Sequence, residues 1–376
     1  MEPDWEAVRA EFPALARWTF LNTATFGQLP RRCNDAVARH FVHRNAQACW
    51  NFLDWFDDAD AVRASIARLI QCQAEDIAFI TNAASALSLL MSGLPWNAGD
   101  RVVTLAGEFP NNLYNPAVLA RRGVECAEVP WEAFHEAVTA RARLVILSTV
   151  NYTTGFRPPL AETAAFLRER GVLFYVDGTQ SLGALEFSVP AVQPDMLAVD
   201  AYKWLLGPTG SGFVYVRPDL RRVLEPAVIG WRSHKDWRNV GSLHHGAPEF
   251  SEAAERYEGG MLNFPSIYGL GASVEMMLEI GPARIERRVM ELADRARATL
   301  RGLGGEVTGD GLLHFDSPVV AARFAGADAT RLAARLKARR VQVSARHGLL
   351  RVSTHFYNCE EDLEVLGWEL GGLLSG

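Results

Sequence analysis

The sequence predicts an α/β protein with a mostly parallel central sheet in a large domain and a smaller α+β domain. The length of 376 residues exceeds what one domain usually contains. Short β-rich apolar runs alternate with helical patterns through the first two thirds of the chain, and longer helical stretches replace them afterwards. We therefore expect a large domain over residues 16–250 and a small domain over residues 1–15 and 251–376.

Five apolar runs predict the strands of the large domain. Each is short and mostly apolar, as is typical of strands that are buried on both faces of a parallel sheet. Since ligands of such sheets bind beyond the carboxyl ends of the strands, the polar residues that follow each run are the first candidates for a site. The runs are Arg101–Thr104, Leu144–Ser148, Leu173–Val176, Met196–Val199 and Phe213–Val216, and helical segments such as Leu160–Arg170 lie between them.

The small domain is predicted from a change of pattern near Ser251. Long helical stretches follow, and two strand-like pieces surround a shorter helical segment. Residues 1–15 are amphipathic and contain no strand of their own, so we expect them to pack on this domain. The helical stretches are Ile267–Ile280, Ile285–Leu303 and Thr330–Arg339, and the strand-like pieces are Val319–Phe324 and Leu349–Ser353.

The composition is that of an ordinary globular protein, with 49% apolar and 22% charged residues. Lys and Arg number 38 against 44 Asp and Glu, and the resulting net charge of −6 disfavours nucleic acid as a partner. Five cysteines without a CxxC pair argue against a disulfide framework. The first residues lack a signal-peptide pattern, and the most apolar stretch, residues 78–96, is too polar for a membrane span. We therefore expect a cytoplasmic protein with no membrane partner.

Two strand ends carry an aspartate and a lysine. One apolar run leads into Asp177, and another leads into a turn that contains Lys203. A buried aspartate needs a positive partner, and a lysine in an apolar turn bounded by glycine and proline is a candidate for a lowered pKa and for Schiff-base chemistry. Taken singly, a helix-capping Asp177 and a surface Lys203 are the simpler explanations. Together they suit pyridoxal 5'-phosphate (PLP), because a lysine holds its aldehyde and an aspartate keeps its pyridine nitrogen protonated.

Four segments make the sequence similar to the class V aminotransferase and cysteine desulfurase family of fold-type I PLP-dependent enzymes, nearly from end to end. By this resemblance, Lys203 forms the Schiff base, Asp177 contacts the pyridine nitrogen and Gln180 donates a hydrogen bond to the phenolic oxygen of the cofactor. The resemblance also implies a homodimer, in which the segment of Gly260 and Met261 reaches the cofactor phosphate of the neighbouring subunit. The four segments are Phe20–Ala24, Val176–Gln180, Tyr202–Gly210 and Leu350–Asn358.

The phosphate of PLP is expected at the start of a helix in the large domain. The free N–H groups there belong to Ala83, Ala84 and Ser85, and Tyr202 is a candidate for an additional hydroxyl contact. Most relatives carry hydroxyl residues in place of Ala83 and Ala84, and Met261 stands where they have threonine. The sequence therefore leaves open a weakly held cofactor, or an ordinary helix N-terminus without a ligand.

Three further residues are assigned from the resemblance and from their chemistry. Phe109 aligns with the residue that stacks on the pyridine ring, where desulfurases usually have histidine; a phenyl ring cannot move a proton. Asn151 is a second candidate for the phenolic oxygen. Arg351 matches an arginine that binds the α-carboxylate, for which a planar guanidinium is suited. The simpler alternatives are a core aromatic side chain for Phe109 and a solvated strand arginine for Arg351.

These assignments predict an enzyme that removes the α-proton of an amino acid or a related amine, with Lys203 as the base. A class V aminotransferase is expected first, and a PLP-dependent C–S or β-lyase or an amino-acid epimerase second. A cysteine desulfurase is disfavoured because residues 341–350, where the family carries its nucleophilic cysteine, contain none. A non-catalytic relative is the last alternative, since the lysine and its two partners are intact. Four aromatic residues hint at an apolar substrate side chain: Phe26, Trp50, Trp55 and Trp231.

Overall fold

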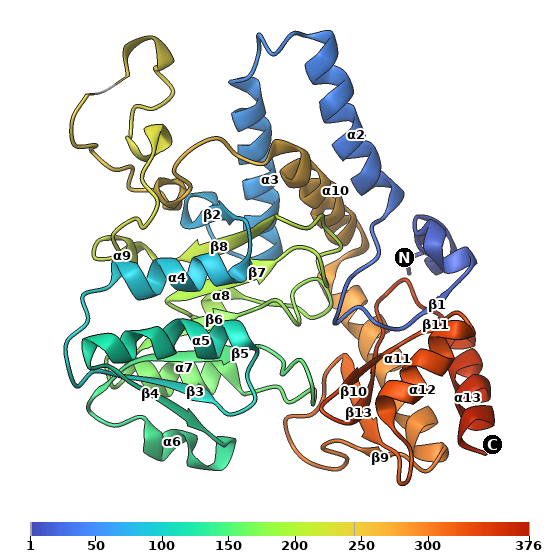
Figure 1. Ribbon diagram of the computed structural model, residues 1–376. Coiled ribbons are helices and arrows are strands. Elements are labelled where there is room, and N and C mark those ends of the chain that lie inside the picture. Colours follow the sequence, from blue (N-terminus) through green and yellow to red (C-terminus); the bar gives the residue numbers. More distant parts are fainter. Residues whose placement is uncertain (1, 244, 376) are drawn as a thin grey trace.

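A seven-stranded sheet forms the centre of the larger part of the molecule in this computed structural model, which describes residues 2–243 and 245–375 (Figure 1). Its strands are β2 (Ile77–Ile80), β3 (Arg101–Leu105), β4 (Glu125–Val129), β5 (Ala142–Ser148), β6 (Leu173–Asp177), β7 (Met196–Asp200) and β8 (Gly212–Val216). The order is β2-β8-β7-β6-β5-β3-β4. Strands β3 to β7 are all parallel, β8 is antiparallel to β7, and β2 is antiparallel to β8. The predicted α/β class with a mostly parallel sheet is confirmed.

All five apolar runs of the sequence are strands of this sheet, and β2 and β4, the two edge strands, lie outside those runs. The pattern of β4 has a physical reason. This strand lies at the edge of the sheet, where one face of the strand is open. Its exposed Glu125 and Glu128 therefore interrupt the apolar pattern.

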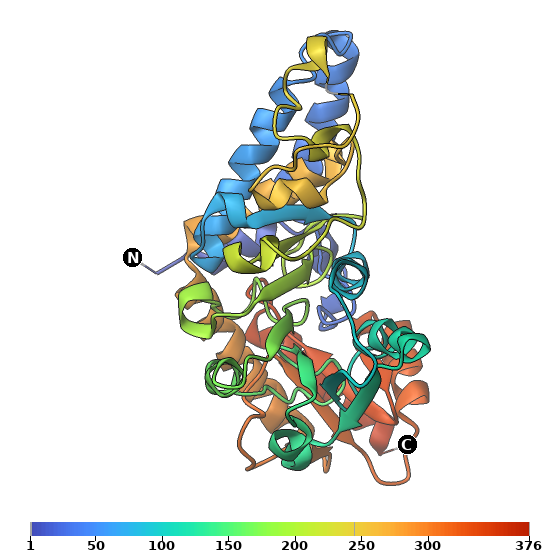
Figure 2. The same cartoon turned by 90° about the vertical axis from the view of Figure 1, so that its left-hand side faces the viewer.

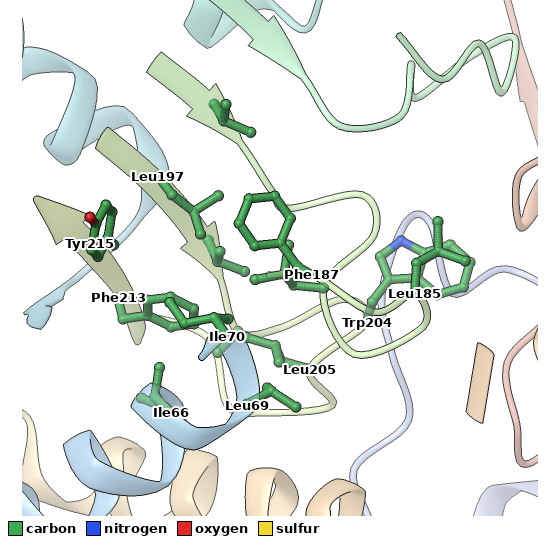
Figure 3. Close-up of a cluster of buried hydrophobic side chains, with 14 of the residues drawn as sticks. Ile66, Leu69, Ile70, Leu185, Phe187, Leu197, Trp204, Leu205, Phe213 and Tyr215 are labelled. Carbon is green, nitrogen blue, oxygen red and sulfur yellow. The ribbon is translucent and has the colours of Figure 1, made fainter. Parts of the chain in front are cut away.

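Helices cover both faces of the sheet. One face packs against α4 (Ala83–Gly93), and the other against α3 (Asp54–Ile70), α7 (Leu160–Arg168) and α10 (Phe264–Ile280). Figure 3 shows the α3 residues Ile66, Leu69 and Ile70 close to Phe213 and Leu205. The remaining helices of this part are α2 (Arg31–Ala46), α5 (Pro110–Ala117), α6 (Phe134–Ala137), α8 (Val189–Val192) and α9 (Pro218–Arg221).

The smaller part of the molecule holds a second sheet with its own core. Its elements are α11 (Pro282–Gly302), β9 (Glu306–Val307), β10 (Val319–Arg323), α12 (Ala329–Ala338), β11 (Val341–Gln342), β12 (Ser344–Arg346), β13 (Leu349–Ser353) and α13 (Glu360–Leu374). The antiparallel order is β12-β13-β10-β9, and the separate strand β1 (Thr19–Phe20) pairs with β11. The first helix, α1 (Trp5–Ala10), lies against this part, where Arg9 pairs with Asp362 at 2.8 Å.

The packing of α10 bears on where the two domains divide. This helix lies against α2 and α3, which form a long pair that extends away from the sheet (Figures 1 and 2). Its core residues, such as Leu270 and Val274, belong to the cluster of the larger part. The division into domains stays a proposal, and this packing moves its second boundary from residue 251 to about Gly281. Within the described residues, no helix is both long and apolar enough to cross a membrane.

Candidate active site

The core fixes the turn that carries Lys203. Trp204 and Leu205, which follow the lysine, are fully buried (Figure 3). The ring of His355 donates from Nε2 to the Trp204 carbonyl at 2.8 Å, while its Nδ1 accepts the N–H of Phe356. Burial lowers the pKa of His355 to about 3, so the ring is neutral and its role here is structural. A Cβ at Gly183 would lie 2.2 Å from the Trp204 carbonyl oxygen, which explains the glycine there.

Lys203 is the buried lysine among the three in the chain. Its side chain lies at the carboxyl edge of the sheet and only 6% of the residue is exposed, whereas Lys235 and Lys337 are exposed. Burial lowers the pKa of Lys203 to about 8, against the opposing effect of Asp177 and Asp200. No hydrogen bond or ion pair with a described residue fixes its Nζ. A buried amine with a lowered pKa and no fixed partner among the described residues fits the aldehyde of PLP.

Asp177 lies at the end of β6, where a buried network holds its carboxylate. One oxygen accepts the N–H of Thr179 at 3.0 Å and the other accepts Asn112 Nδ2 at 3.3 Å. The same Asn112 amide donates to Glu108, which also accepts the backbone N–H of Ser148 at 2.7 Å. Burial raises the pKa of Glu108. The carboxylate is therefore oriented for a positive partner, although Glu108 and Asn112 were not identified from the sequence as site residues.

The Gln180 amide is oriented by two protein contacts. Its Oε1 accepts the indole N–H of Trp204 at 3.0 Å, and its Nε2 donates to the Ala24 carbonyl at 3.1 Å. The indole can only donate, which fixes the orientation of the amide. One N–H of Gln180 remains for the phenolic oxygen of a cofactor, so its expected role stays a prediction.

The N-terminus of α4 is already partly satisfied by protein groups. Asp200 Oδ1 accepts the N–H of Ala83 at 2.8 Å, and Asn82 Oδ1 accepts the N–H of Ser85 at 2.9 Å. The Ser85 hydroxyl donates to the Asn82 carbonyl at 2.6 Å. The N–H of Ala84, in the first turn, has no partner within the helix. The expected phosphate contact at this helix start stays a prediction, and a charged Asp200 opposes it because an anion beside the site repels a phosphate.

Arg351 is buried on β13, with 1% of the residue exposed. Its Nε donates to Ser344 Oγ at 3.0 Å, Nη1 to the Tyr152 carbonyl, and Nη2 to Thr25 Oγ1 at 2.6 Å. A guanidinium has five N–H donors, so one remains on each terminal nitrogen. Two N–H groups are what a carboxylate needs, so the expected role of Arg351 stays a prediction. Because the residue is buried, the solvated-arginine alternative is wrong.

The other expected residues differ in how close they lie to Lys203. Its Nζ is 5.2 Å from the centroid of the Phe109 ring and 5.5 Å from that of Tyr202. Phe26 packs on Tyr202 at a centroid distance of 5.0 Å. The Oδ1 of Asn151 accepts from Thr153 and Thr154, and its Nδ2 donates to the Gly107 carbonyl, so Asn151 stabilises its own loop and its expected cofactor contact stays a prediction.

Three tryptophans from the sequence do not support an aromatic substrate pocket. Trp55 packs edge-on against Phe264, Trp231 packs against Trp237, and Trp50 is 75% exposed. The first two belong to the aromatic core around α3. The expectation of a pocket lined by these tryptophans is therefore not supported, and of the four aromatic residues only Phe26 contacts the site.

A buried lysine facing two buried carboxylates at the carboxyl edge of a parallel sheet defines an α/β protein with a lysine-centred site. The chain belongs to the class V aminotransferase family, whose pattern matches residues 22–366. It is 28% identical over 390 residues to a probable cysteine desulfurase of Methanothermobacter thermautotrophicus, with 96% of both chains covered. It is 30% identical over 398 residues to isopenicillin N epimerase of Streptomyces clavuligerus, with 98% of both covered.

Solved structures share the fold over nearly the whole chain. The apo cysteine desulfurase of Thermococcus onnurineus NA1 superimposes with a TM-score of 0.88 at 24% identity, covering 99% of this chain and 98% of that one. A variant of C-DES with glycine covalently linked to its PLP cofactor has a TM-score of 0.88 at 22% identity, with 98% and 99% covered. The resemblance predicted from the sequence is confirmed.

Proposed function

We propose that this protein is a PLP-dependent enzyme that acts at the α-carbon of an amino acid, with transamination as the first candidate reaction. The observation that carries the proposal is the buried amine of Lys203, which has no hydrogen-bond or ion-pair partner among the described residues and interacts electrostatically with the carboxylate of Asp177. When bound, PLP supplies a protonated pyridine ring that accepts the electron pair released at the α-carbon.

Each residue of the site has a separate role around that ring. Asp177 holds the proton on the pyridine nitrogen, and the network through Asn112 and Glu108 keeps its carboxylate in position. Arg351 binds the α-carboxylate and thereby orients the α-proton. Lys203 takes this proton, for which a pKa near 8 is suited at neutral pH. Phe109 covers the site as a flat apolar side chain.

Epimerisation is the second candidate, supported by the 30% identity to isopenicillin N epimerase. Cysteine desulfuration is kept as an outcome because of the desulfurase relatives, although the segment before Arg351 carries no cysteine. The homodimer also stays a proposal, supported by Met261, which is 60% exposed in the segment that the family uses across its interface. The cytoplasmic location is likewise a prediction.

A screen of amino acids for spectral change of the bound cofactor tests the reaction. Keto acid, ammonia, racemised product and sulfide are assayed separately. Conversion of the cofactor to its amine form together with a keto acid identifies a transaminase, and racemised product without keto acid identifies an epimerase. A cofactor spectrum that no amino acid changes would contradict the proposal.

Replacing Arg351 with lysine is expected to lower kcat/KM toward α-amino acids by about 10- to 100-fold. The variant keeps the charge but loses the planar fork, and a charge-assisted pair contributes about 1.5–3 kcal/mol. Steady-state kinetics measure the effect, and simple amines without a carboxylate serve as the control because they should be nearly indifferent. Equal losses for both substrate classes would show that Arg351 supports the fold or the cofactor.

Replacing Asp200 with asparagine is expected to strengthen PLP binding about tenfold at pH 8, because it removes a negative charge beside the phosphate. Burial, followed by Asp177, raises the pKa of Asp200 to about 6. The side chain is thus neutral below that pH and charged above it, so the advantage of the variant should disappear near pH 5. Cofactor dissociation followed by absorbance measures this, with the exposed Asp219→Asn variant as control. Weaker binding by Asp200→Asn at pH 8 would mean that Asp200 supports the α4 N-terminus instead.

A further inference from the structure

Two arginines of the small sheet converge on one hydroxyl. The register of β12 and β13 pairs Ser344 with Arg351, and Arg346, two residues further along β12, lies on the same face as Ser344. Arg351 Nη2 donates to Thr25 Oγ1 at 2.6 Å, and Arg346 Nη2 donates to the same atom at 3.3 Å. The two guanidinium groups are therefore neighbours across Thr25.

Neither arginine is neutralised by the protein. Among the described residues, no Asp or Glu forms an ion pair with Arg346 or Arg351. Burial, followed by the charge of Arg346, lowers the pKa of Arg351 to about 9. Both arginines also lower the pKa of Lys203. Two unpaired positive charges side by side repel one another, and a bound anion removes that repulsion.

Arg346 and Arg351 together offer more N–H donors than one α-carboxylate can accept. The fork of Arg351 accounts for one carboxylate, as described above. Arg346 donates from Nη1 to the Ala345 carbonyl at 2.7 Å and from Nη2, weakly, to Thr25. Its Nε–H and further N–H groups have no partner among the residues that the structure describes. Its side chain is half-buried, so a ligand can reach it.

We propose that Arg346 binds a second carboxylate, at the end of the substrate side chain, so that the preferred substrates are amino dicarboxylic acids. This rests on the proposed function, in which Arg351 holds the α-carboxylate. It replaces the apolar side chain that the tryptophans suggested from the sequence.

The test compares ligands that lack an amino group and therefore bind without reacting. Calorimetry on the PLP-loaded protein measures binding of glutarate and of butyrate to the wild type, to Arg346→Gln and to Arg323→Gln, an exposed arginine on the same sheet. We expect the wild type and Arg323→Gln to bind glutarate about tenfold more tightly than butyrate or better, and Arg346→Gln to lose that preference while its butyrate affinity changes less than about twofold.

Two results would overturn the inference. Equal weakening of both ligands in Arg346→Gln would mean that the two arginines share a single carboxylate, and unchanged binding of both would mean that Arg346 only supports Thr25. The outcome is separable from the proposed function. A dicarboxylate preference that depends on Arg346 without turnover of any amino acid would contradict only the proposed function, and turnover without such a preference would contradict only this inference.

Discussion

Lys203→Ala is expected to lose turnover by about 10⁴-fold or more and to lose the visible absorption of lysine-bound PLP. The variant removes both the amine that holds the cofactor and the base that takes the α-proton, and general-base catalysis alone contributes about 10²- to 10⁴-fold. Absorbance spectra and amino acid turnover measure the two effects.

The chain has two other lysines, which serve as controls for this experiment. Lys235, which pairs with Glu249 at 2.6 Å on the surface, and the exposed Lys337 are matched controls, and their alanine variants should keep both the absorption and the activity. Circular dichroism checks that Lys203→Ala is folded. A folded Lys203→Ala protein that still shows lysine-bound cofactor after borohydride reduction and peptide mapping would refute the assignment of Lys203.

The lysine and the aspartate could be predicted because Asp177 is the last residue of the buried strand β6 and Lys203 lies three residues after the end of the buried strand β7. In a parallel sheet, the carboxyl ends of neighbouring strands meet at one edge, so residues just after β6 and β7 are brought together whatever else the chain does. The apolar runs were long enough to mark those strands, and the glycine and proline after Lys203 marked the turn. The sequence thus contained both the positions and their proximity.

The hydrogen-bond partners of the site residues were harder to predict from the sequence. The contact between Asp200 and the N–H of Ala83 joins residues 117 apart, and that between Arg351 and Thr25 joins residues 326 apart. Such contacts depend on how two cores pack, which no local pattern reports. Asp200 could nonetheless be recognised in the sequence as a second carboxylate at a strand end, three residues before Lys203.

The interpretation of the tryptophans and the proposed shift of the domain boundary depend on the same helix packing. Helix α10 is apolar on several faces because it lies between α2, α3 and the rest of the core, so its sequence resembled the start of a new domain. Trp55 and Trp231 are part of the same aromatic packing around Phe56 and Phe264. Large aromatic residues at a helix interface thus looked like pocket residues until the partner helix was known.

Asp177→Asn is expected to slow α-proton removal by about 10²- to 10⁴-fold while leaving the fold intact. Asparagine has nearly the same shape and can still accept the N–H of Thr179, so the backbone after β6 stays in place. What is lost is the negative charge that keeps the pyridine nitrogen protonated, and a neutral ring is a much poorer electron acceptor. Exchange of the α-proton of a bound amino acid with deuterated water isolates this step from later ones.

Asn112→Ala is the companion variant, because it removes one hydrogen bond to Asp177 and leaves the charge in place. A loss of about tenfold or less is expected there, since a single neutral donor contributes about 0.5–1.5 kcal/mol. Comparing the exchange rates of the two variants separates the contribution of the Asp177 charge from that of its orientation. A much larger loss of rate in Asp177→Asn than in Asn112→Ala assigns the effect to the charge. Exchange at the wild-type rate in Asp177→Asn would show that its carboxylate only shapes the end of β6 and does not keep the pyridine nitrogen protonated.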